Sequence, residues 1–188
     1  MDMTLHLLSR EDLETVREWR NSEEVSKYMY SAPQISAEQQ IAWFERISKD
    51  DTKRYWVIRY GGRPIGLVNV ADIDLHNRRC NWGFYFGVTN LRGQGFASRV
   101  EFNVLRYVFD VLDLNKLYCE VFEWNKNVVA LHSKFGFRRE GYFREHVMKD
   151  GVLQDIVFMG VIKRDWKTIR SYYVEKLYGG EENLPLIP

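Results

Sequence analysis

The segment between Trp82 and Ala97 combines residue types that suit the binding of an anion. Its first half is aromatic and predicts a strand, and its second half carries two glycines and leads into an apolar-periodic helix. The start of such a helix directs backbone N–H groups and the positive end of the helix dipole to one spot. Gly93 and Gly95 leave the main chain open to close approach, and Arg92 adds a positive charge. The segment predicts a phosphate-binding loop without a P-loop lysine, or else a plain tight turn.

The elements that position this loop follow from hydrophobic periodicity and turn signals. Strands are predicted over 4–8, 55–60, 64–70, 79–86, 116–122, 137–149 and 152–162, and helices over 9–20, 36–48, 95–112 and 126–135. Two capping-box patterns begin at Ser9 and Ser36. Gly61-Gly62 and Asp150-Gly151 are hairpin turn pairs. The order predicts an α/β (α+β) domain with a mixed sheet of about seven strands and helices on both faces.

Composition narrows the function classes. The chain has 188 residues, 45% of them hydrophobic and 28% charged, which suits one domain over 1–178 with a tail over 179–188. The formal net charge of +1 argues against a nucleic-acid partner. Cys80 and Cys119 are too few for a disulfide scaffold and lack the spacing of a zinc site. Neither a signal peptide nor a membrane-spanning run is recognised, so we expect a cytoplasmic protein, either a monomer or a homodimer.

Two motifs together resemble those of the GNAT N-acetyltransferase family, over nearly the whole chain. Arg92-Gly93-Gln94-Gly95-Phe96-Ala97 is similar to the pyrophosphate signature Arg/Gln-x-x-Gly-x-Gly/Ala. The segment from Asn125 to Phe137 is similar to the second motif, Asn…Ala-x-x-x-Tyr-x-Lys-x-Gly-Phe. Their separation and the intervening strand and helix also fit. The resemblance implies the GNAT fold, in which the sheet is splayed between its fourth and fifth strands.

The resemblance also implies a co-substrate and a reaction. Acetyl-CoA would lie in the splay, and an amine would attack its thioester directly, with no metal and no cysteine nucleophile. A backbone N–H near Phe84–Phe86 would polarise the acetyl carbonyl. The residues that the resemblance assigns to the cofactor are Phe84, Tyr85, Phe86, Arg92, Gly93, Gln94, Gly95, Phe96, Ala97, Asn125 and Lys134.

The residues that would act as general acid and general base are less clearly indicated than those that would bind the cofactor. The family commonly protonates the leaving thiolate with a tyrosine, but the matching position here is His132. Histidine suits acid chemistry near neutrality, although this one could instead pack or bond beside the cofactor. Glu120 is the preferred base, with Glu123 and Asp155 as alternatives. A substrate amine of low pKa could also lose its proton to water.

The acceptor is suggested by the early helices. The segments around Trp19-Arg20-Asn21 and Gln40–Phe44 resemble the GNAT enzymes of pseudaminic-acid biosynthesis, which acetylate the 4-amino group of a UDP-linked 4-amino-4,6-dideoxy sugar. Arg20 could pair with a diphosphate, against a helix-end salt bridge as its alternative. Tyr28, Trp43 or Trp82 could stack on a sugar or uracil, against core packing.

Other acceptors and one other class of function stay open. The ribosomal-protein and polyamine acetyltransferase branches of the family fit the later part of the chain almost as well. A polyamine acceptor would require exposed carboxylates, of which Glu23 and Glu24 form a small pair. A non-catalytic acyl-CoA sensor would keep the glycine loop and lack turnover.

Overall fold

The computed structural model describes residues 3–32, 34–88 and 93–188. Its strands are β1 (Met3–Leu7), β2 (Arg54–Tyr60), β3 (Arg63–Asp74), β4 (Arg79–Phe86), β5 (Lys116–Phe122), β6 (Arg138–Lys149) and β7 (Val152–Ile162). Its helices are α1 (Leu13–Asn21), α2 (Glu23–Ser26), α3 (Ala37–Ile47), α4 (Phe96–Arg106), α5 (Lys126–Lys134) and α6 (Lys163–Tyr178). The predicted strands and helices are therefore confirmed to within a few residues.

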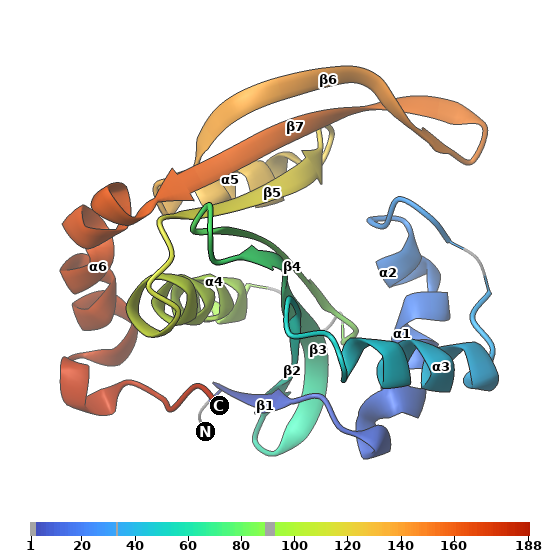
Figure 1. Ribbon diagram of the computed structural model, residues 1–188, viewed down its shortest axis with the longest axis horizontal. Helices are drawn as coiled ribbons and strands as arrows, with labels where there is room; N and C mark the ends of the chain where they lie inside the picture. Colours follow the sequence, from blue (N-terminus) through green and yellow to red (C-terminus); the bar gives the residue numbers. More distant parts are fainter. Residues whose placement is uncertain (1–2, 33, 89–92) are drawn as a thin grey trace.

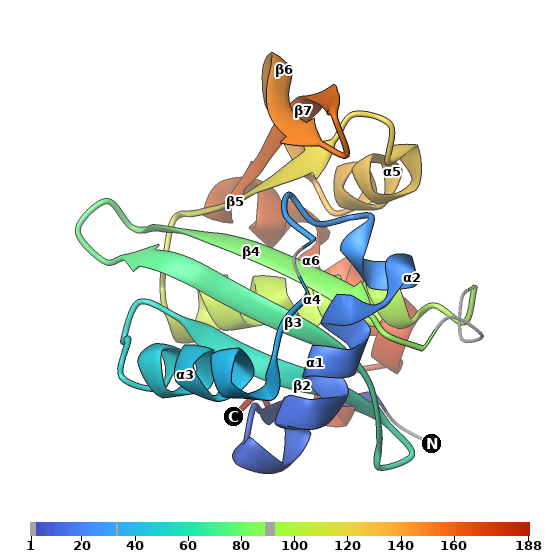
Figure 2. The ribbon, with the colours of Figure 1, turned by 90° about the vertical axis from the view of Figure 1, so that its right-hand side faces the viewer.

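Within the described residues, seven strands form one mixed sheet in the order β1-β2-β3-β4-β5-β7-β6. β4 and β5 are parallel neighbours, whereas the other pairings run antiparallel. Helices α1, α2 and α3 lie on one face of β2 and β3, and α4 and α6 lie on the other (Figures 1 and 2). The predicted mixed sheet with helices on both faces is confirmed.

The predicted helix and hairpin signals operate as expected. At Ser36, the side-chain oxygen accepts the Gln39 N–H at 3.2 Å, and the Gln39 side chain accepts the Ser36 N–H at 2.9 Å. This reciprocal pairing satisfies two N–H groups that a helix start would otherwise leave free. Asp150 and Gly151 both have positive φ, of 50° and 79°, as the tight turn between β6 and β7 requires.

The central helix ends differently from the prediction. The helix expected over 95–112 ends as α-helix at Arg106 and continues as a π-helical turn over Tyr107–Val111. Tyr172, Tyr173, Leu177 and Tyr178 suit a final helix that docks on the domain or on a second subunit, and α6 follows β7 directly and packs on the domain. Its Trp166 is fully buried against Phe102 and Phe109 of the α4 segment, so packing from this helix completes the core.

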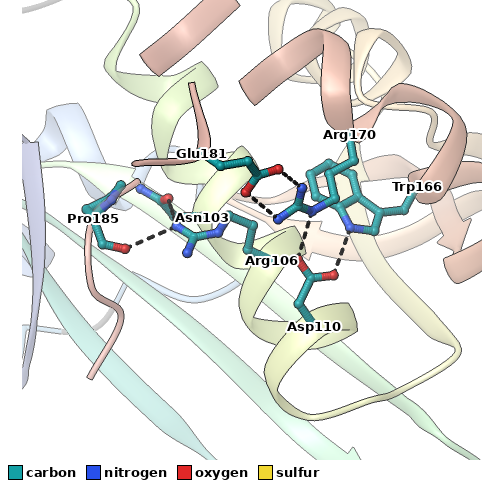
Figure 3. A network of polar contacts seen from close by, with 7 residues as sticks. All are labelled: Asn103, Arg106, Asp110, Trp166, Arg170, Glu181 and Pro185. Atoms are coloured by element: carbon teal, nitrogen blue, oxygen red, sulfur yellow. Dashed lines mark hydrogen bonds and ion pairs between the residues drawn. The ribbon is translucent and has the colours of Figure 1, made fainter. Parts of the chain in front are cut away.

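A polar network joins α6, the end of α4 and the C-terminal residues (Figure 3). Arg170 Nε donates to Asp110 Oδ2 at 3.0 Å, and the same guanidinium bonds both carboxylate oxygens of Glu181. Arg106 donates to the Pro185 carbonyl at 3.1 Å. Trp56 of β2 donates to the Pro188 carbonyl at 2.9 Å, so the last residues cover the α4 side of the sheet.

Among the described residues, no helix is both long enough and apolar enough to cross a membrane.

We expect Arg170→Met to lower the free energy of unfolding by about 1–2 kcal/mol, because charge-assisted hydrogen bonds of a half-buried group are lost while solvent weakens part of the effect. Arg164→Met is the matched control, since the Arg164 side chain is 82% exposed and lies 3.8 Å from its nearest carboxylate. Urea unfolding of both variants measures the difference. Equal stabilities of the two variants would contradict the role given to the network.

Candidate functional site

The parallel strands β4 and β5 separate part-way along their length. They pair at Arg79, Cys80 and Asn81 of β4 and diverge beyond that point, although β4 continues to Phe86 and β5 to Phe122. On its other edge β4 stays paired with β3 through Phe86. The splay expected between the fourth and fifth strands is therefore present, and it leaves one edge of β4 without a strand partner among the described residues.

The alternation of hydrogen bonds along β4 decides which of its groups face this gap. Gly87 N–H donates to the Ile65 carbonyl of β3 at 3.0 Å. Residues two apart on a strand point their backbone groups the same way, so Gly83 and Tyr85 face β3 as well. The N–H groups of Phe84 and Phe86 consequently point to the side on which β5 has departed.

The glycine-bearing loop ends at the start of α4. Gly93 and Gly95 have φ of 84° and 78°, in the left-handed region that favours glycine. Gly95 caps the helix, and its carbonyl accepts the Arg99 N–H at 3.3 Å. The N–H groups that precede Arg99 belong to the first turn, where an α-helix has no internal partners for them.

The residues of the loop differ in their exposure to solvent. Gly93, Gln94 and Gly95 are exposed, whereas the Phe96 ring is 8% exposed and packs on Tyr60. Phe96 and the partly buried Ala97 can therefore serve an anion through their backbone N–H groups. The predicted contact of Arg92 lies outside the described residues.

A cavity of about 720 Å³ opens from the splay toward α1, α2 and α3. This volume lies within the range of small-molecule sites in proteins. The cavity brings together ten residues that the sequence predicted for the site: Arg20, Tyr28, Trp43, Trp82, Phe84, Tyr85, Phe86, Glu120, Asn125 and His132. These residues come from five elements, the turn after α2 and the cap of α5, so one space joins the cofactor and acceptor halves of the prediction.

Four buried polar atoms on the lining have no hydrogen-bond partner among the described residues. They are Arg20 Nη1, Gln40 Nε2, Trp82 Nε1 and Tyr85 Oη. Burial also raises the pKa of the Tyr85 hydroxyl, which therefore stays protonated. Buried polar groups are rarely left unpaired because each costs about 1–3 kcal/mol. Three of the four atoms can only donate, and the protonated Tyr85 hydroxyl can donate as well, so the lining is suited to a ligand rich in acceptor oxygens.

Arg20 reaches the cavity because α1 packs closely on the end of β4. A Cβ at Gly87 would lie 2.1 Å from the Trp19 ring, so the bare backbone there admits the preceding side chain of α1. The Tyr85 ring meets Trp19 edge-on, with ring centroids 6.4 Å apart. The helix-end salt bridge that was the alternative for Arg20 does not form with any described residue.

The three predicted aromatic contacts differ in setting. Trp43 meets Tyr55 edge-on at 5.1 Å, and Tyr28 lies 5.5 Å from Trp124, both partly exposed at the cavity. Trp82 is 3% exposed, and its ring packs against Phe84, His132 and Phe137. Tyr28 and Trp43 are therefore the more accessible of the three.

The three candidate bases differ in whether they line the cavity. Glu120 lines the cavity, where its carboxylate accepts the Tyr30 hydroxyl at 2.6 Å. Burial together with this bond raises the pKa of Tyr30. Glu123 pairs with Lys126, and Asp155 accepts Tyr142 Oη and the Glu145 N–H, which lower its pKa. Neither of these two carboxylates is on the cavity lining.

His132 is 3% exposed, and its Nδ1 lies 2.9 Å from Oε1 of Glu101, which is fully buried on α4. Burial alone would lower the pKa of His132, but the Glu101 carboxylate reverses this and raises it. Burial raises the pKa of Glu101 itself. The pair therefore keeps a proton at neutral pH, beside the wall of the cavity.

Several lining residues were not predicted from the sequence. Tyr30, Gln40 and Asn69 line the cavity, and Glu101 lies behind it. Glu24, one of the two carboxylates considered for a polyamine, lines the cavity as well. Gln40 belongs to a segment already noted for its neighbour Trp43, but a glutamine in a helix carries no distinguishing pattern.

The tip of the β6–β7 hairpin is held beside the cavity by Lys149, which donates to the carbonyls of Ser26 and Met29 at 3.1 and 2.9 Å.

Two residues assigned to the cofactor lie at opposite ends of α5. Asn125 caps α5 and lines the cavity, whereas Lys134 is exposed at the opposite end of that helix and is not on the lining. A cofactor contact of Lys134 stays a prediction.

Among the described residues, no three His, Cys, Asp or Glu side chains are grouped to hold a metal ion.

Comparisons with known proteins bear on this geometry. Residues 2–138 match the model of a family described as an acetyltransferase (GNAT) domain. The spermidine N(1)-acetyltransferase of Vibrio cholerae is 26% identical over 162 residues, which are 86% of this chain and 93% of that protein. Acetyltransferase PseH of Campylobacter jejuni is 25% identical over 130 residues, which are 69% of this chain and 79% of that protein.

A solved structure agrees in the fold. The crystal structure of the Vibrio cholerae spermidine N-acetyltransferase in complex with CoA and spermine matches with a TM-score of 0.83 at 26% identity, over 88% of this chain and 98% of that one. The two motifs, the splayed strands and the match of more than half of the chain lead to one assignment. This protein belongs to the GNAT family of acetyltransferases.

Proposed function

We propose that the protein transfers an acetyl group from acetyl-CoA to the amine of an anionic, oxygen-rich small molecule, a UDP-linked 4-amino-4,6-dideoxy sugar. The observation that carries this choice is the buried Arg20 Nη1, which has no partner among the described residues and lines the cavity. A guanidinium matches phosphate geometry better than any other side chain. An unpaired cation in a cavity also opposes the entry of a positively charged acceptor.

The residues fit acetyl-CoA. The first-turn N–H groups of α4, reached through Gly93 and Gly95, suit a pyrophosphate. The unpaired edge of β4 suits the amide groups of pantetheine, which would add to the sheet as a strand does. Bound there, acetyl-CoA supplies an activated acyl group as a thioester.

The chain's own groups then have distinct tasks in a direct transfer. The N–H groups of Phe84 and Phe86 face the splay and can stabilise negative charge on the acetyl oxygen. Glu120 is the carboxylate that can accept a proton from the amine, directly or through water. His132 can donate a proton to the departing sulfur.

The acceptor half has a polar and an aromatic part. Arg20, Gln40 and Tyr85 supply unpaired donors for phosphate or hydroxyl oxygens. Tyr28 and Trp43 are accessible rings on which a sugar or uracil face can stack. The similarity to acetyltransferase PseH over 69% of the chain supports the same acceptor class.

A polyamine is the second candidate, and separate observations favour it. Glu24 and Glu120 also line the cavity, and carboxylates are what a polycation needs. The similarity to spermidine N(1)-acetyltransferase extends over more of this chain, 86%. Arg20 and the carboxylates make opposite demands, so their variants separate the two acceptors.

We expect Gly95→Val to weaken CoA binding at least tenfold, because a β-branched residue at positive φ costs about 1–2 kcal/mol and displaces the first-turn N–H groups. Gly62→Val is the matched control: Gly62 has φ of 77°, and a Cβ at either glycine meets nothing within 4 Å. Calorimetric titration with CoA measures both variants. CoA bound as tightly by Gly95→Val as by the control would remove the loop from the cofactor site.

For the acceptor, we expect thiol release from acetyl-CoA with the UDP-amino sugar, and a KM for that sugar at least tenfold higher in Arg20→Met because a phosphate partner is lost. With spermidine, Arg20→Met would lower KM by removing a repelling charge. Glu24→Gln is the control with the opposite expectation. It should raise the KM for spermidine, because a carboxylate that attracts the polycation is lost, and leave the KM for the UDP-amino sugar unchanged.

The kinetic assay uses the sugar, spermidine and a ribosomal-protein N-terminal peptide in parallel. Turnover of spermidine alone, with KM raised by Glu24→Gln, would overturn the nucleotide-sugar assignment in favour of the polyamine. Tight CoA binding without thiol release for every amine would instead favour a sensor.

A further inference from the structure

A carboxylic acid and an imidazole are buried together at the back of the cavity. Glu101 comes from α4 and is 0% exposed, and His132 comes from α5 and is 3% exposed. The pair joins the helix that begins at the glycine loop to the helix of the second motif, through a contact of 2.9 Å between Oε1 and Nδ1. Acidic groups are almost never fully buried without a specific partner.

We propose that Glu101 is a positioning residue for acetyl transfer, which holds Nδ1 of His132 so that Nε2 carries the proton received by the departing CoA sulfur. The inference rests on the reaction proposed above and adds the group that orients its acid. An ionised carboxylate can only accept, so in the proposed arrangement Nδ1 carries a proton and donates it to Glu101. Nε2 is the ring nitrogen that Glu101 does not contact, and His132 lines the cavity together with Cys119.

The surroundings of the ring confine its proton exchange. Trp82 of β4 and Phe137 pack against the ring, with ring centroids 5.1 Å away in both cases. The titratable groups that act on the pair are the Cys119 thiol of β5, beside His132, and Tyr173 of α6, which senses the charge of Glu101. No lysine or arginine takes part among these contacts, so the Glu101 carboxylate sets the charge balance.

The second oxygen of Glu101 gives an independent indication. Oε2 is buried and has no hydrogen-bond partner among the described residues. Leaving it unpaired costs stability, and an apolar residue of similar volume would avoid that cost. A purely structural pair has no need of this arrangement, whereas a carboxylate kept for its effect on the imidazole does.

The proton balance of the step is simple. The amine nitrogen forms a bond to the acetyl carbon, the carbon–sulfur bond breaks, and the sulfur takes its proton from Nε2 of His132. The amine loses a proton to Glu120 or to water. His132 ends the step neutral, still bonded to Glu101 through Nδ1, and regains its proton from solvent after the products leave.

The effect of Glu101 on the pKa of His132 can be measured in the absence of any acceptor amine. Histidine labelled with ¹³C in the ring gives four titration curves, because the chain contains four histidines, and His132→Phe identifies the one sought. We expect His132 to keep its proton above the ordinary range of a histidine, and Glu101→Gln to move its midpoint down by about 1–3 pH units, the effect of losing a close opposite charge. Removal of the carboxylate leaves burial, which favours the neutral ring, so the shift must be downward.

Activity is measured with whichever amine turns over best, so a wrong acceptor class leaves this test intact. The alkaline limb of kcat should move to lower pH in Glu101→Gln and stay in place in Glu175→Gln, a matched change at an exposed position of α6. In a His132→Phe background, Glu101→Gln should change kcat less than twofold, because its effect passes through the imidazole. CoA affinity and melting temperature report whether each variant is folded.

Two results would overturn the proposal. One is a His132 midpoint that Glu101→Gln leaves unchanged. The other is a loss of kcat from Glu101→Gln that is as large without His132 as with it, which would indicate a structural role. Absence of turnover with every amine, combined with the expected shift of the midpoint, would count against the proposed reaction and leave the charge coupling of the pair established.

Discussion

The separation of β4 from β5 is the constraint around which the rest of the molecule is arranged. Beyond Asn81 the backbone of β4 has no strand partner on one side within residues 3–32, 34–88 and 93–188, and buried N–H and C=O groups must be paired. A sheet interior can tolerate such an edge when a ligand supplies the missing bonds. The long β3 strand holds the other edge through Phe86, so β4 stays extended while β5 turns away.

The elements on either side of the gap follow from this separation. Helix α4 begins where β4 has ended, so its first-turn N–H groups lie near the open end of the splay. Helix α5 follows β5 and carries Asn125 and His132 to the same space. On the opposite face, α1 and α3 close the cavity, and Lys149 ties the β6–β7 hairpin to the loop after α2.

Charge is unevenly distributed within this space. Arg20 Nη1 is buried on the side of α1 and has no hydrogen-bond partner in the described part of the chain, whereas Glu120 lies on β5 with Tyr30 bonded to it. A ligand with an anionic portion and an amine satisfies both ends, since opposite charges are most valuable where water is excluded. The chain is similar both to spermidine N(1)-acetyltransferases and to acetyltransferase PseH. Because a fold does not specify a substrate, the proposed acceptor rests on these side chains and not on the sheet.

The sequence by itself determined the strands, the caps, the hairpin turns and the family, because periodicity, Ser36 and Gln39, and Asp150-Gly151 act over a few residues. It also indicated Arg20, Glu120 and His132 as chemical groups. Only the tertiary structure decided that Glu101 pairs with His132, that Gln40 Nε2 and Tyr85 Oη face the cavity without a partner among the residues described, and that α6 completes the core. These outcomes depend on contacts between residues about 30 or more positions apart, and a local pattern carries no information about which distant side chain will face a given atom.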